Sequence, residues 1–205
     1  MHSKRWQERV AEAKNNKEEW QSVIEIKFLG RGGQGAVVAS EILGKSFFLE
    51  GKYPQSFSIF GNERRGAPVF GFLRVDEEPI LLKCQIRHPG QMMVFDFSLV
   101  NEASIIRELR PDGLLLVNTK RGIESFRELK RFKIGLIDAG SIARSAGLGD
   151  AFNTAMLGAY VRLTHLVRMD TLIDAVRTMV PARVEENVRT VHEAYEQTRV
   201  FEREG

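Results

Sequence analysis

The chain contains little cysteine and little histidine. Its 205 residues include one cysteine, Cys84, which excludes an intrachain disulfide, a CxxC redox pair and an iron–sulfur cluster held by this chain alone. The four histidines lie far apart, without the spacing of a metal site, at His2, His88, His165 and His192. We therefore expect this chain to bind no metal by itself.

Long apolar runs and a large excess of charge are also missing. No stretch approaches the roughly 20 apolar residues that span a bilayer, and residues 1–20 have no apolar signal core. This predicts a cytoplasmic protein without membrane insertion. A net charge of +3 is too small to indicate nucleic-acid binding without a clustered basic patch. No repeat or Pro/Gly-rich linker divides the chain, so we expect one compact domain over residues 23–205.

Residues 1–22 form a separate N-terminal extension. Its residues 3–20 are predicted to be an amphipathic helix, with Trp6, Val10, Ala13 and Trp20 near one face and charged residues elsewhere. Two tryptophans on a short charged helix need an apolar surface to lie on. Packing on its own domain and docking on a partner remain equally open.

Strand and helix patterns alternate along the rest of the chain. The β-branched run at residues 23–29 predicts a strand, and apolar positions at spacings of three and four between Val37 and Phe48 predict a helix after it. Further strands are predicted at residues 55–60, 68–75, 80–85, 92–97, 114–118 and 133–137, and short helices at 100–109 and 123–130. From Ala151 the chain is predicted to be entirely helical, with Pro181 separating the last two helices.

These patterns favour an α/β fold. Strands that are almost wholly apolar are typical of a sheet covered by helices on both faces, whereas the strands near residues 57–84 are joined by short polar turns and predict antiparallel pairing. We expect a Rossmann-like mixed β-sheet flanked by helices, with an inserted antiparallel β segment and a helical C-terminal part.

The strongest local motif is GRGGQG at residues 30–35. Gly30, Gly32 and Gly35 have the GxGxxG spacing, directly after a strand and at the start of a helix. Such a turn lets backbone N–H groups and a helix N-terminus approach an anion. A dinucleotide site also needs an acidic residue at the end of the next strand; Glu50 has the separation but lies at a predicted helix end. A tight turn that binds nothing therefore remains an alternative.

The second motif is FGNERRGAP at residues 60–68, a loop between two predicted strands. Adjacent Arg64 and Arg65 follow Glu63. The planar guanidinium suits phosphate or carboxylate because it donates two parallel hydrogen bonds. An ion-pair network with Glu63, or with a partner surface, explains the same residues equally well.

Other polar residues give weaker signals. Lys120 and Arg121 follow a predicted strand, at the sheet edge where α/β proteins place ligands, and Asp138 ends the next strand. Asn153 begins a helix, where it is expected to act as a cap. Cys84 is expected to be a small core residue rather than a nucleophile.

Long segments of this sequence resemble a known family, the gamma subunits of 2-oxoacid:ferredoxin oxidoreductases, most closely those of the pyruvate type. The resemblance covers roughly residues 23–200. The segments that carry it are GRGGQGAVVASEIL (30–43), GKYPQSFSIFGNERRGAPVFGFLRV (51–75), EEPI (77–80), LLLVNTKR (114–121) and NTAMLGAY (153–160).

The resemblance implies a multi-subunit thiamine-diphosphate enzyme with Mg²⁺ that decarboxylates a 2-oxoacid. It transfers the acyl group to coenzyme A and passes electrons through [4Fe–4S] clusters to ferredoxin. In such complexes the alpha and beta subunits hold thiamine diphosphate, and a ferredoxin-like delta subunit holds clusters. The gamma chain helps to assemble the complex near the route of coenzyme A, and is not catalytic alone.

The resemblance also suggests which residues contact coenzyme A or another subunit. These are Gly30, Arg31, Gly32, Gly33, Gln34, Gly35, Glu63, Arg64, Arg65, Lys120, Arg121 and Asn153. Three alternatives stay open. The complex acts on an aromatic or branched 2-oxoacid with NAD as the final acceptor, reached through a flavin subunit; the chain is a free-standing NAD- or FAD-binding Rossmann protein; or it is a scaffold without a ligand.

Overall fold

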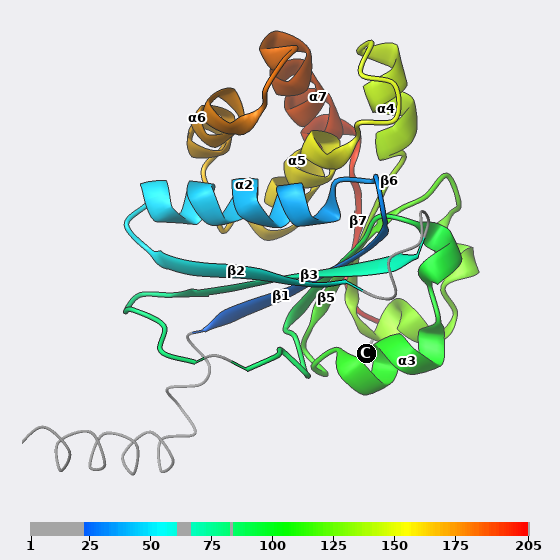
Figure 1. Cartoon of the computed structure of the whole chain (residues 1–205). Helices are drawn as coiled ribbons and strands as arrows, with labels where there is room; N and C mark the ends of the chain where they lie inside the picture. Colours follow the sequence, from blue (N-terminus) through cyan, green and yellow to red (C-terminus); the bar gives the residue numbers. More distant parts are fainter. Residues whose placement is uncertain (1–22, 61–66, 83, 205) are drawn as a thin grey trace, which may run out of the picture.

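One mixed sheet of seven strands organises the chain (Figure 1). The computed structural model describes residues 23–60, 67–82 and 84–204. The predicted helix at residues 3–20 lies outside these residues. Within them, the strand order across the sheet is β2-β3-β1-β4-β5-β6-β7. The strands are β1 (Ile24–Arg31), β2 (Tyr53–Phe60), β3 (Pro68–Asp76), β4 (Gln91–Val94), β5 (Leu114–Asn118), β6 (Lys133–Ile137) and β7 (Arg199–Phe201).

The sheet combines parallel and antiparallel pairing. β1, β4, β5 and β6 run parallel to one another. β3 lies antiparallel to β1, and β2 antiparallel to β3, so an antiparallel pair extends the parallel part beyond β1. This arrangement confirms the predicted Rossmann-like mixed sheet with an inserted antiparallel segment.

Helices cover the two faces of the sheet unequally (Figure 1). On one face lie α2 (Ala36–Leu49), α4 (Ala139–Ser145), α5 (Asn153–Thr164), α6 (Met169–Met179) and α7 (Val184–Gln197). On the other lie α3 (Glu102–Glu108) and the short 3₁₀ helices η3 (Ile123–Ser125) and η4 (Glu128–Arg131), while η2 (Phe97–Leu99) follows β4. Alternate side chains of one strand therefore enter different cores: Met93 joins the α2 side, whereas Met92 and Val94 join the α3 side. Among the described residues, no helix is both long enough and apolar enough to cross a membrane.

Some sequence-based expectations are wrong. The described residues between 80 and 85 form no strand; the Cys84 carbonyl instead accepts a hydrogen bond from the Arg74 side chain at 3.2 Å. Cys84 is consequently exposed rather than part of the core.

The prediction was also wrong in the second half of the chain. The helix expected at residues 123–130 is two 3₁₀ turns, η3 and η4, between which the buried Phe126 enters the α3-side core. The C-terminal part is not entirely helical, because β7 pairs antiparallel with β6 and Phe201 packs against the same core. Helix α4 was not predicted.

Helices α5 and α7 approach closely at Gly158. A Cβ atom placed on Gly158 would lie 2.1 Å from the carbonyl oxygen of Val191. Since that neighbour is helix backbone, it cannot rotate away as a side chain can. The absence of a side chain at residue 158 therefore sets the distance between the two helices.

We predict that Gly158→Ala destabilises the protein. Overpacking of a core costs roughly 1–3 kcal/mol, which exceeds the gain of up to about 1 kcal/mol from replacing a helical glycine. Urea unfolding measures the difference. Gly140→Ala in α4 is the control, because its Cβ would meet only the flexible end of Arg144 at 3.3 Å; equal stability of the two variants would contradict the packing argument.

Candidate functional site at the carboxyl edge of the sheet

The parallel strands change the direction of their connections between β1 and β4. After β1 the chain enters α2 on one face of the sheet, and after β4 it enters α3 on the other (Figure 1). β1 and β4 are neighbours, paired from Ile26 with Gln91 to Leu29 with Val94. A reversal of this kind opens a crevice beyond the carboxyl ends of the strands, where open α/β sheets bind ligands.

The glycine-rich motif lies at this crevice, in the turn from β1 to α2. Gly33 and Gly35 have positive φ angles of 94° and 73°, a conformation that L-residues with side chains rarely adopt. Gly30 also has little space for a side chain, because a Cβ there would lie 3.1 Å from the Cβ of Ala36 and 3.3 Å from that of Phe95. Gly35 caps α2 without a side-chain hydrogen bond, and the first turn of α2 has no acidic residue.

Side chains from both strands meet across the crevice. Gln34 accepts a hydrogen bond from the Arg31 backbone N–H at 2.8 Å and donates one through Nε2 to Asp96 Oδ2 at 3.0 Å. Arg31 Nε also donates to Asp96 Oδ2 at 3.0 Å, and its terminal nitrogen donates to the Ser98 hydroxyl at 2.8 Å. Gln34, predicted to contact a ligand or partner, thus finds hydrogen-bond partners inside the turn. Asp96 ties the glycine turn to the end of β4.

Asp96 is held as a carboxylate. Partial burial by itself would raise the pKa of Asp96, but hydrogen bonds from the Ser98 hydroxyl and backbone N–H, from Gln34, and the charge of Arg31 together bring its pKa below the usual 3.8. The charge at the crevice is therefore fixed at neutral pH, and it is shared with a guanidinium.

The ends of β5 and β6 continue this edge. Asn118 donates to the Phe95 carbonyl at 3.0 Å and accepts from the Ala139 N–H at 3.0 Å, which joins β4, β5 and the start of α4. Asp138 caps α4 through the Ser141 N–H at 3.0 Å. Burial would raise the pKa of Asp138, but the hydroxyl and N–H of Ser141 and nearby cations bring it below its usual range.

The predicted cations Lys120 and Arg121 lie on this edge. Lys120 is 72% exposed, with its ammonium 3.7 Å from Asp138 Oδ2. The Arg121 guanidinium lies over the Phe97 ring, 4.4 Å from the ring centroid, and Phe97 directly follows Asp96. Arg31 and Arg121 therefore contact the same short segment that follows β4, and Lys120 lies next to Arg121 at the end of β5.

Asn153 does not cap α5, which was the sequence-based expectation. Phe152 occupies the cap position and the cap has no side-chain hydrogen bond. Asn153 instead packs on the glycine turn: a Cβ on Gly35 would lie 3.0 Å from its Cβ. Asn153 thereby connects the turn to a neighbouring cavity.

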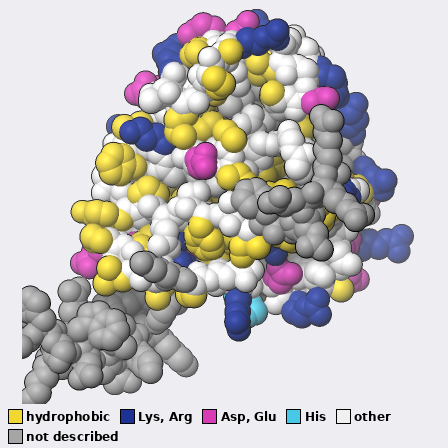
Figure 2. Space-filling model, in the orientation of Figure 1, with side chains coloured by type: hydrophobic (Ala, Val, Ile, Leu, Met, Phe, Trp, Pro, Cys, Tyr) yellow, Lys and Arg dark blue, Asp and Glu magenta, His cyan; other side chains and the backbone are white. Residues whose placement is uncertain are grey.

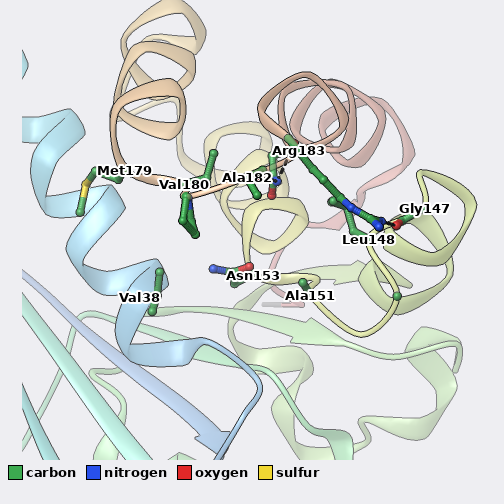
Figure 3. A pocket seen from close by; sticks show the side chains of 12 residues that line it. Val38, Gly147, Leu148, Ala151, Asn153, Met179, Val180, Ala182 and Arg183 are labelled. Atoms are coloured by element: carbon green, nitrogen blue, oxygen red, sulfur yellow. Dashed lines mark hydrogen bonds between the residues drawn. The ribbon is translucent and has the colours of Figure 1, made fainter.

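That cavity has a volume of about 480 Å³ and opens between α2, the start of α5 and the turn before α7 (Figure 3). Its apolar wall includes Val38, Leu148 and Met179, and its polar groups include Asn153 and Arg183. The Arg183 guanidinium reaches the Gly147 carbonyl across the cavity (Figure 3). Sequence reasoning did not identify this cavity, because it is formed by loops between helices.

The second predicted motif is placed only in part. Glu63, Arg64 and Arg65 lie outside the described residues. The loop that contains them connects β2 to β3, and its last residue, Ala67, accepts a hydrogen bond from the Gly32 N–H at 3.2 Å. The loop is therefore attached beside the glycine turn.

Asp96, Ser98 and Asn118 were missed by the sequence reasoning. A signal was available for Asp96, because this acid directly follows the apolar run MMVF of a predicted strand, as Asp138 follows another. Within the described ranges, no three His, Cys, Asp or Glu side chains are grouped as metal ligands.

This fold and this edge define an α/β protein with a Rossmann-like glycine turn that is bridged internally. Comparison with known proteins then places the chain in a family. The sequence model of the family described as pyruvate ferredoxin/flavodoxin oxidoreductase matches residues 25–197, and the chain belongs to this family.

The most similar relatives include two subunits of this kind. The pyruvate/ketoisovalerate oxidoreductases common subunit gamma of Pyrococcus abyssi is 44% identical over 185 residues, covering 88% of this chain and all of the relative. The pyruvate synthase subunit PorC of Methanothermobacter marburgensis is 42% identical, covering 85% and 97%. Among solved structures, the pyruvate oxidoreductase subunit PORC of Thermotoga maritima superposes with a TM-score of 0.75 at 32% identity, covering 87% and 98%. The chain is thus a gamma-type subunit of a multi-subunit oxidoreductase.

We predict that Asp96→Asn destabilises the protein at neutral pH by about 1 kcal/mol or more, because it removes charge-assisted hydrogen bonds. Since folding lowers the pKa of Asp96, its stabilising effect is present above the usual value of 3.8 and is lost as the pH falls below that value. The variant should therefore lose less stability than the unmodified protein between pH 7 and acid pH in urea unfolding.

The control for this measurement is Asp112→Asn, in an exposed turn before β5. An acid dependence that is the same in the Asp96→Asn variant and the unmodified protein would show that the bridge across the crevice does not stabilise the fold.

Proposed function

We propose that this chain is the gamma subunit of a thiamine-diphosphate and iron–sulfur complex that converts pyruvate and coenzyme A to acetyl-CoA, CO₂ and reduced ferredoxin. Its partners in this proposal are alpha and beta catalytic subunits and a ferredoxin-like delta subunit. The names of the relatives support pyruvate as the substrate. The observation that supports a binding role most strongly is the set of cations beside the bridged glycine turn.

The residues of this chain do not fit a [4Fe–4S] cluster, because such clusters are held by cysteine thiolates and the sequence has one cysteine. In the proposal, thiamine diphosphate and the clusters belong to the partner subunits and supply decarboxylation and electron transfer there. The contribution of this chain is to bind and orient coenzyme A, which carries several phosphate charges.

The carboxyl edge suits that role. Arg31 is held by Asp96 and Ser98, so the glycine turn keeps its shape while the N-terminus of α2 stays without a side-chain cap. Lys120 and Arg121 present exposed cations beside it. A phosphate group that approaches this edge meets the positive charge of these side chains. We infer that the ligand recognised here is coenzyme A, whose phosphate groups carry more negative charge than the single carboxylate of a 2-oxoacid such as pyruvate.

The choice of 2-oxoacid is assigned in this proposal to other subunits. The name of the Pyrococcus abyssi relative states that it is common to pyruvate and ketoisovalerate oxidoreductases. A branched or aromatic 2-oxoacid, with NAD as final acceptor, therefore remains the alternative substrate class. Assays of the purified complex with a panel of 2-oxoacids distinguish these cases.

We predict that the double variant Lys120→Ala and Arg121→Ala raises the KM for coenzyme A by roughly 5- to 10-fold, since exposed ion pairs contribute up to about 1 kcal/mol each. The KM for pyruvate should not change. The measurement is steady-state kinetics of the reconstituted complex. Arg87→Ala is the matched control, because Arg87 is exposed in the segment before β4, at the opposite edge of the sheet.

Arg64→Ala with Arg65→Ala is expected to act in the same direction, raising the KM for coenzyme A more than that for the 2-oxoacid. If both KM values stay unchanged while the complex dissociates, this loop is an assembly element alone. An unchanged KM for coenzyme A in both double variants would contradict the proposed binding role of the edge.

A further inference from the structure

Among the described residues, no helix covers one half of the sheet face opposite α2. Ser56 of β2 bonds to Ser40 of α2 at 2.9 Å, so the even-numbered residues of β2 face α2. The odd-numbered residues therefore point to the other face. There α3 and the 3₁₀ helices pack on the side chains of β4, β5 and β6, and only the irregular segment after β3 passes beneath β2 and β3 (Figure 1).

This face is apolar and exposed. We name it the β2 face and define it by Tyr53, Phe57 and Ile59 of β2, together with Leu81 and Leu82 of the segment that passes beneath β2 (Figure 1). Tyr53 is 45% exposed, Leu81 78% and Ile59 39%. A hollow of about 470 Å³ lies within it, lined by Phe57, Ile59 and Cys84, among others. Figure 2 shows apolar side chains gathered on the flank where α2 ends and β2 begins. A long apolar edge strand left open in this way favours unwanted association, which proteins commonly prevent by covering it.

The N-terminal extension joins the described chain beside this face. Glu25, near the start of β1, accepts a hydrogen bond from Arg74 Nε at 3.0 Å. The same guanidinium donates to Gln55 at 3.2 Å and to the Cys84 carbonyl at 3.2 Å, and both of these residues line the hollow. A single side chain, Arg74, therefore connects the point where the extension meets the sheet with the rim of the hollow.

The extension has the composition and the length to cover the β2 face. Its predicted apolar stripe runs from Trp6 to Trp20, which in a helix spans roughly 21 Å. An eight-residue strand such as β2 spans about 23 Å. The family match begins at residue 25, so the extension precedes the part of the chain that is shared with the family.

We propose that residues 3–20 form a helix that packs its tryptophan stripe on the β2 face of the same chain. The extension then covers the exposed side chains of Tyr53, Ile59 and Leu81 and shields the edge strand β2. This inference is independent of the proposed binding of coenzyme A, because the two surfaces share no residue.

The chain offers an unusually direct test, because both of its tryptophans lie in the extension and its one cysteine lies in the hollow. We would attach a nitroxide quencher to Cys84 in the full chain and measure tryptophan emission in the Trp6→Phe and Trp20→Phe variants. The proposal predicts a loss of emission in both. The control is Cys84→Ser with Asp174→Cys, which moves the label to exposed α6 on the opposite side of the sheet and should leave the emission unchanged.

A substitution on the β2 face provides the second measurement. Leu81→Asp should shift the tryptophan emission of the unlabelled chain to the red and increase its quenching by acrylamide. The matched control Leu166→Asp replaces a leucine that is 37% exposed outside the β2 face and should change neither. Because Leu81 is largely exposed, the fold should survive its replacement, which circular dichroism checks.

Four results would overturn the proposal. Equal quenching by labels at Cys84 and at position 174 would show that the extension lies elsewhere. A tryptophan emission that does not change in the Leu81→Asp variant would show the same. Loss of the quenching on dilution would mean that a second copy supplies the covering helix. Quenching that develops only when other subunits are added would mean that the β2 face is an inter-subunit surface.

Discussion

The hydrogen bonds of Asp96 with Arg31 and Gln34 hold together the point where the connections of the parallel strands change direction. At this point α2 and α3 leave on opposite faces of the sheet, after the paired strands β1 and β4. One carboxylate oxygen accepts from both side chains. The shape of the glycine turn, the start of α2 and the position of the segment that carries Phe97 all depend on this bridge.

The bridge also bears on how the dinucleotide-type motif can bind a ligand. In a dinucleotide site the pyrophosphate would occupy the crevice, whereas here a carboxylate lies in it and the turn satisfies part of its own hydrogen bonding. What remains available is the outer edge, with Lys120, Arg121 and the uncapped end of α2. An edge of this kind suits an anionic group that arrives from a neighbouring subunit, in keeping with a chain that belongs to a multi-subunit oxidoreductase.

The sequence predicted the fold well where periodicity is strong and locally determined. The strands at residues 114–118 and 133–137, and the turn at Gly30–Gly35, follow from apolar runs and glycine spacing. The sequence-based prediction failed where contacts between distant segments decide the structure. The segment around Cys84 bonds to the Arg74 side chain instead of joining the sheet, and β7 depends on the chain returning to β6. The role of Asp96 was not predicted because its partners, Arg31 and Gln34, are more than 60 residues away in the sequence. The cavity beside Asn153 was not predicted because it arises only from the packing of loops.

The most direct test of this account is the native mass and composition of the protein purified gently and without oxygen from its own cell. The account predicts that larger subunits co-purify with it, together with thiamine diphosphate and iron–sulfur absorbance, and that the complex reduces ferredoxin when given pyruvate and coenzyme A. A lone species of 23.3 kDa that carries a bound dinucleotide would contradict it. The glycine motif would then have to be interpreted as a dinucleotide site in its own right.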